Sequence, residues 1–128
     1  MNEYRGKERR QFLRYDFEKP FRYSVINTPE DKGVFSKMMD AFSKNISASG
    51  ILFTAKEVPK IASLLMLDLD YQTLKICQEI ESRVLIIRNK IVGKVVRIED
   101  NEDGLCGIGI AFIKKSDALS KDIEQLIK

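Results

Sequence analysis

The order of apolar and polar positions along the chain predicts several short strands. Residues 20–26 alternate, because Phe21, Tyr23 and Val25 fall on one face while Arg22 and Ser24 fall on the other. This alternation is typical of a half-buried strand. Runs rich in β-branched or alternating apolar residues predict further strands at 51–54, 64–70, 83–88, 91–99 and 108–112.

Two segments are ambiguous by pattern alone. Residues 34–44 carry apolar side chains at helical spacing, which favours a helix, although the neighbouring segments predict strands. Residues 74–81 fit either a turn of helix or an irregular crossing.

Turn formers and glycines separate these elements. Residues 27–33 predict a loop, and 100–104 predict a charged turn that ends in glycine. Gly107 and Gly109 indicate a close backbone approach or a bulge in the last strand. Residues 116–128 predict a closing helix, capped by Ser116 or Asp117. Many short strands followed by one helix favour an antiparallel barrel that the C-terminal helix closes.

Length and composition bound the class of protein. A chain of 128 residues with 44% apolar and 32% charged side chains has the size and balance of one globular domain. No stretch approaches the roughly 18 apolar residues of a membrane span. Residues 1–10 lack the apolar core of a secretory signal, so we expect a cytoplasmic protein.

The residue types that carry most catalysis and metal binding are scarce. The chain has no histidine and two cysteines, Cys77 and Cys106, which we expect to be unpaired, small buried side chains. We find no tight acidic cluster, no nucleophile and base pair, and no glycine-rich phosphate loop with a catalytic lysine. We therefore expect no enzyme activity, no metal and no cofactor.

The positive charge is concentrated at the N-terminus. Residues 1–14 hold five basic and two acidic side chains, which leaves 17 of each sign among the 22 basic and 19 acidic residues of the chain. Such an arm attracts an anionic partner. The balanced remainder offers no basic face, so we do not expect nucleic-acid binding.

Two short motifs stand out. Arg10 and Arg14 form an R-x-x-x-R pair in the basic arm, and Arg9 precedes it. Residues 45–50 read Asn-Ile-Ser-Ala-Ser-Gly and lie at the entry to a predicted strand. In this order and at this separation, the pair resembles the signature of the PilZ family, R-x-x-x-R followed by [D/N]-x-S-x-x-G. In the second motif, the matching residues are Asn45, Ser47 and Gly50.

The resemblance implies a fold and continues more loosely through residues 93–97 and 107–112. It implies a PilZ-type split β-barrel of about six antiparallel strands over residues 20–113, with a flexible N-terminal arm over 1–19 and a C-terminal α-helix over 116–128. It also implies a strand over 34–44, and we prefer this to the helix that periodicity favours.

The resemblance further implies a cyclic di-GMP receptor or adaptor, whose output is read by an unidentified effector protein. Arg9, Arg10 and Arg14 would clamp the ligand, because a guanidinium matches both phosphate and the O6 and N7 acceptors of guanine. Asn45 and Ser47 would contact a guanine, and Gly50 would allow the backbone conformation and a close approach. Whether one ligand or a stacked pair binds stays open. The alternative is a degenerate PilZ-like interaction module that binds no nucleotide.

Overall fold

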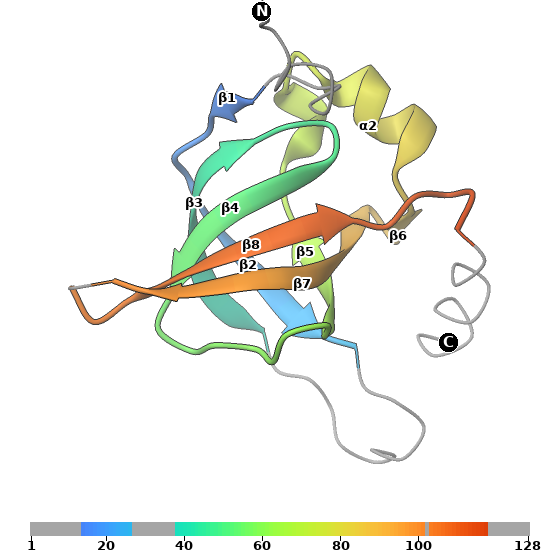
Figure 1. Cartoon of the computed structure of the whole chain (residues 1–128). Coiled ribbons are helices and arrows are strands. Elements are labelled where there is room, and N and C mark those ends of the chain that lie inside the picture. The colour runs from blue at the N-terminus through green and yellow to red at the C-terminus, as the bar shows by residue number, and fades with distance from the viewer. Residues whose placement is uncertain (1–13, 27–37, 102, 118–128) are drawn as a thin grey trace, which may run out of the picture.

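The computed structural model describes residues 14–26, 38–101 and 103–117, and within them the chain is built mainly of short strands (Figure 1). The elements in chain order are β1 (Tyr15–Asp16), β2 (Pro20–Val25), β3 (Met39–Ile46), β4 (Gly50–Ala55), β5 (Leu64–Asp68), the 3₁₀ turn η2 (Tyr71–Thr73), α2 (Cys77–Arg83), β6 (Ile86–Ile87), β7 (Lys90–Asp100) and β8 (Cys106–Phe112).

Six of these strands form a closed antiparallel barrel. Neighbouring strands follow the order β3, β2, β5, β7, β8, β4, and the ring closes because β4 also pairs with β3. β1 pairs with the end of β3, and β6 pairs with β7. Closure leaves the ring without a free edge strand. The predicted all-β antiparallel barrel of about six strands is confirmed.

The barrel interior is filled by side chains from alternate strand positions. Phe21 and Tyr23 point inward from β2 and contact Phe53 of β4, with ring centroids 5.1 and 5.4 Å from that of Phe53. Ile108, Ile110 and Phe112 are buried on the inner face of β8. The alternation predicted for 20–26 and for 108–112 is therefore confirmed, and it supplies the aromatic centre of the core.

The segment that periodicity assigned to helix is a strand where the structure describes it. β3 begins at Met39, and Phe42 lies on its outer face with 43% of its surface exposed, while Ala41 and Ser43 point inward. Met39 and Phe42 lie three residues apart, as on a helix face, but on β3 they lie on opposite faces. The strand implied by the family resemblance is confirmed for residues 39–44.

Between β5 and β7, the helix alternative is confirmed and part of the strand prediction is wrong. α2 extends to Arg83. Within it, the Ile80 side chain is fully buried against the core, and the Ile80 carbonyl accepts a hydrogen bond from the Val84 amide (2.9 Å). Only Ile86–Ile87 of the predicted strand 83–88 pairs with β7. The helix takes up Arg83, and Val84 forms only an isolated bridge with Lys114.

The bulge predicted near Gly107 and Gly109 lies on the opposite strand, where the register shifts between Val95 and Arg97. The close backbone approach occurs elsewhere, at Gly50, as described below. The arm expected over 1–19 is described only from residue 14, and there the expectation of a flexible arm is wrong for Tyr15–Asp16, which form β1 and pair with β3. Residues 1–13 of the arm, the loop over 27–33 and residues 118–128 of the helix expected over 116–128 lie outside the described residues. No helix in the described part of the chain has the length and apolar character needed to cross a membrane.

A buried serine positions the first strand on the barrel. The hydroxyl of Ser43 donates to the carbonyl of Phe17 and accepts from the Lys19 amide (3.0 Å) where the chain bends between β1 and β2. The amide of Phe17 also donates to the carbonyl of Lys44 (3.0 Å). These bonds hold residues 15–25 along one edge of β3. As a result, β1 lies at the end of the barrel where β3 ends.

We expect Ser43→Ala to lower the free energy of unfolding by about 1–3 kcal/mol, because it leaves buried backbone groups without a partner. Denaturant unfolding measures this change. Ser82→Ala is the matched control, since its hydroxyl bonds to Glu79 at an exposed position. Equal effects of the two substitutions would show that Ser43 does not hold the bend.

Tyr23 should make stability fall at high pH. Burial, and to a smaller extent the Glu57 carboxylate, raise the pKa of Tyr23 from 10.0 to about 12, and its hydroxyl donates to the backbone carbonyl of Glu57 (2.8 Å). The unfolded chain therefore releases this proton at lower pH than the folded chain. We expect this group to remove stability as pH rises from 10 to 12, by up to about 1.4 kcal/mol per pH unit.

The measurement is denaturant unfolding from pH 8 to 12 for the wild type and Tyr23→Phe. The variant should be less stable at neutral pH, because it lacks the hydrogen bond, and should lose less stability above pH 10. Parallel curves for the two proteins would contradict the assignment.

Candidate functional site

The two sequence motifs meet at one end of the barrel. β1 pairs with the end of β3 so that Tyr15 lies opposite Ile46 and Asp16 opposite Asn45. Arg14 directly precedes β1, so the same antiparallel register places its backbone beside Ser47. Figure 1 shows β1 next to the turn that joins β3 to β4. The structure thus brings the second arginine of the first motif to the second motif, whereas Arg9 and Arg10 lie outside the described residues.

Ser47 shapes the turn between β3 and β4. Its amide donates to the carbonyl of Gly50 (2.9 Å), and its hydroxyl oxygen accepts from the amide of Ser49 (3.1 Å). The Ser47 side chain is only 2% exposed, and its hydroxyl also lies 3.1 Å from that of Ser49. Side-chain to backbone bonds of this kind fix a local turn. Ser47 therefore holds the rim of the site in one conformation.

Asn45 carries a polar atom that the fold leaves without a partner. Its side-chain oxygen Oδ1 is buried. Among the residues that the structure describes, it is the one buried side-chain nitrogen or oxygen atom without a hydrogen bond. A buried acceptor without a donor costs about 1–3 kcal/mol, and almost all buried polar groups in proteins are satisfied. This oxygen belongs to β3, where Asn45 lies opposite Asp16 and close to the second arginine of the first motif.

Gly50 is required by packing within the barrel. A Cβ atom at this position would lie 2.2 Å from the carbonyl oxygen of Ile110 on β8, which is far inside contact distance. Gly50 therefore allows a close approach between β4 and β8, and the approach to a ligand that the family resemblance implies for this residue stays a prediction. The expected use of glycine's wider backbone freedom is wrong, because Gly104 is the one glycine with positive φ in the described part of the chain.

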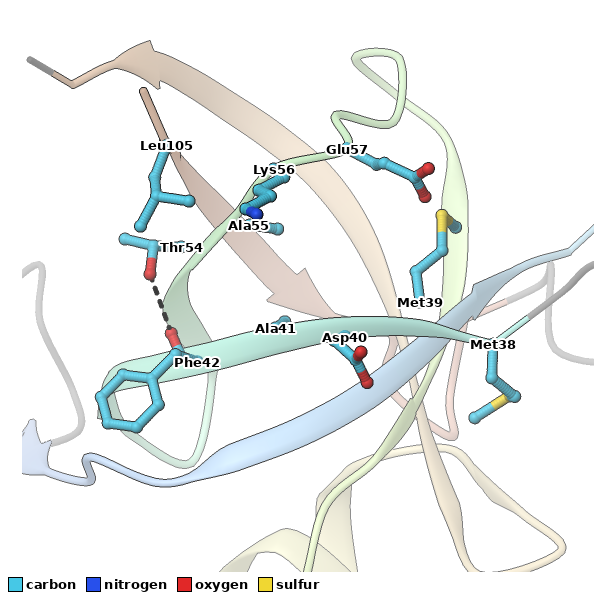
Figure 2. Close-up of a pocket in the computed structure, with 10 residues that line it drawn as sticks. All are labelled: Met38, Met39, Asp40, Ala41, Phe42, Thr54, Ala55, Lys56, Glu57 and Leu105. Carbon is cyan, nitrogen blue, oxygen red and sulfur yellow. Dashed lines mark hydrogen bonds between the residues drawn. The ribbon is translucent and has the colours of Figure 1, made fainter. Parts of the chain in front are cut away.

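Two pockets lie near opposite ends of β3. One of about 260 Å³ adjoins the motif and is lined by Tyr15, Asp16 and Ile46 together with residues 73–76. The other, of about 520 Å³, lies at the start of β3 and is also lined by Lys56 and Glu57, and Met39 points toward Glu57 (Figure 2). A strand rises about 3.3 Å per residue, so the two ends are roughly 20 Å apart. The larger pocket is therefore separate from the motif.

The pocket beside the motif includes residues that the sequence did not single out. Tyr15 and Asp16 follow Arg14 directly, and this adjacency was the signal available for them. Lys75 reaches the pocket from the segment before α2, and no local pattern marked it.

The cysteines do not form a reactive site. Both Cys77 and Cys106 are free and partly buried, which confirms that they do not pair with each other. Burial and Glu81 raise the pKa of the Cys77 thiol, and burial and Asp100 raise that of Cys106, so both stay protonated at neutral pH. Within the described ranges, no three histidine, cysteine or acidic residues gather in a way that could hold a metal ion.

A closed six-stranded antiparallel barrel with a polar turn motif at its rim defines the chain as a small β-barrel domain. A family model for the PilZ domain matches residues 8–128, which include both motifs, and the chain belongs to the PilZ domain family. A search of curated proteins found no match.

We expect Gly50→Ala to lower the free energy of unfolding by at least about 2 kcal/mol, because the added methyl group must displace the backbone of β8. Denaturant unfolding measures the loss. Gly107→Ala is the matched control in the paired strand, since no atom lies closer than 3.8 Å to its added Cβ, and it should change stability by less than about 0.5 kcal/mol. A neutral Gly50→Ala would show that β4 and β8 separate at no cost.

Proposed function

We propose that this chain is a cyclic di-GMP receptor that works as an adaptor, in which the nucleotide joins the arginine-rich arm to the rim of the barrel. The observation that carries the proposal is the pairing of β1 with β3, which brings Arg14 to the Asn45–Gly50 motif beside an unsatisfied buried acceptor. Membership of the PilZ family supports the choice of ligand.

The chemistry of the ligand suits the residues of both motifs. Cyclic di-GMP carries two phosphates and two guanines, and an arginine fork can donate two hydrogen bonds to either group. Arg9, Arg10 and Arg14 would neutralise the phosphates and bind a guanine edge. The buried oxygen of Asn45 needs a donor, and guanine presents an N2 amino group.

The signal would come from ordering of the arm. Three arginines within six residues repel one another, and phosphate charge between them removes that repulsion. When the arm folds over the ligand, it covers the rim at β1 and changes the surface that an effector protein reads. We expect the output to be binding of that partner.

The competing function is a PilZ-like interaction module that binds no nucleotide. It is disfavoured because all five motif positions are filled by suitable residues: Arg10, Arg14, Asn45, Ser47 and Gly50.

We expect cyclic di-GMP to bind the wild-type chain and Arg10→Ala or Arg14→Ala to weaken binding by about 10- to 100-fold. Each arginine makes one or two charge-assisted hydrogen bonds worth about 1.5–3 kcal/mol each. Isothermal titration calorimetry gives the affinity and the number of ligands per chain. Arg97→Ala is the control, since Arg97 is an exposed arginine of β7, paired with Glu99 and outside both motifs.

Binding heat that is lost in Arg10→Ala and Arg14→Ala but kept in Arg97→Ala would support the proposed receptor function. No heat and no shift in melting temperature of the wild type at high ligand concentration would leave the interaction module as the function.

A further inference from the structure

The pocket beside the motif has a lining that suits a particular kind of base. It lies between β1, the end of β3 and the segment that joins η2 to α2, and it has a volume of about 260 Å³. The residues that line it include one aromatic, two of opposite charge, one polar and three apolar, which are Tyr15, Asp16, Lys75, Thr73, Ile46, Leu74 and Ile76. Because Asp16 lies opposite Asn45 in the strand register, the pocket adjoins the proposed nucleotide site.

The size of the pocket limits its occupant. Pockets that enclose whole drug-sized ligands measure roughly 300–1,000 Å³. A volume of about 260 Å³ is too small to enclose a dinucleotide but can take one flat base. Figure 1 shows β1 and α2 at the same end of the barrel, so a ligand held by the motif can extend one base into this space.

Tyr15 supplies a surface on which such a base can stack. Its side chain is 38% exposed, which is high for a large aromatic residue paired with the buried Ile46. Bases stack on aromatic rings with little regard to their identity, so Tyr15 contributes affinity rather than selectivity. Tyr15 directly follows Arg14 in the chain, so its backbone adjoins the arm proposed to bind the phosphates.

Asp16 and Lys75 supply the selectivity. Guanine presents O6 and N7 as acceptors and an amino group at N2 as a donor, whereas adenine presents an amino group in place of O6. A lysine ammonium can donate to O6 and N7, and a carboxylate can accept from the amino donors of guanine. Adenine would place its own amino group toward the ammonium. Opposite charges in one base-sized pocket therefore match guanine.

We propose that this pocket is a guanine subsite of the nucleotide site, in which Tyr15 stacks on one base, Asp16 accepts from its amino donors and Lys75 donates to its O6 and N7 edge. This inference rests on the proposed function. It adds three binding residues outside the two motifs and makes this pocket the source of selection for cyclic di-GMP over cyclic di-AMP.

The test is calorimetric titration of the full chain with cyclic di-GMP and with cyclic di-AMP. Tyr15→Leu, Asp16→Asn and Lys75→Met should each weaken cyclic di-GMP binding by about 10-fold or more. Asp16→Asn and Lys75→Met should also reduce the ratio of the two affinities, whereas Tyr15→Leu should leave that ratio nearly unchanged. Lys56→Met is the matched control, an exposed lysine that lines the other pocket, and it should bind as the wild type does.

Melting temperatures of all variants establish that each is folded. Lys75 is exposed, so its variant keeps the test valid if Tyr15→Leu fails to fold. Wild-type affinity and selectivity in the three pocket variants, with binding lost in Arg10→Ala and Arg14→Ala, would overturn the guanine subsite and leave the receptor intact. Absence of binding by the wild type would instead remove the proposed function, and the subsite with it.

Discussion

Pairing of β3 along both of its edges is the constraint on which the barrel and the candidate site both depend. One edge pairs with β1 and β2, and the other pairs with β4, which closes the ring. The buried hydroxyl of Ser43 holds the bend between β1 and β2 against this strand. Because β3 ends at the motif turn, the same pairing that completes the barrel also sets β1 beside Asn45.

The rim of the barrel combines groups that the fold satisfies with one that it does not. Ser47 and Gly50 are used internally, since the serine closes the turn and the glycine lets β4 approach β8. Asn45 retains a buried acceptor without a donor. Among the described residues, Asn45 is thus the rim position with an acceptor left for the proposed ligand, whereas Ser47 and Gly50 build the rim itself.

Some of this site was accessible from the residues alone. Two motifs in a fixed order led to Arg10, Arg14, Asn45, Ser47 and Gly50, and the structure brings together those that it describes. Lys75 could not be found in this way, because its place beside β1 depends on how the segment before α2 crosses the end of the barrel. The packing of Gly50 against β8 could not be found in this way either, since sequence spacing does not reveal which strand lies beside it.

The sequence by itself determined the class of fold and most strand positions, because alternation in segments such as 20–26 directly reports which side chains can be buried. It also located the two motifs. Pattern left residues 39–44 open between helix and strand, and the family resemblance favoured the strand that the structure shows. Tertiary structure alone decided that only Ile86–Ile87 of the strand expected over 83–88 pair with β7, and that Asp16 and Lys75 line one pocket. The physical reason is that strand partners and pocket walls come from residues far apart in the chain, where local pattern carries no information.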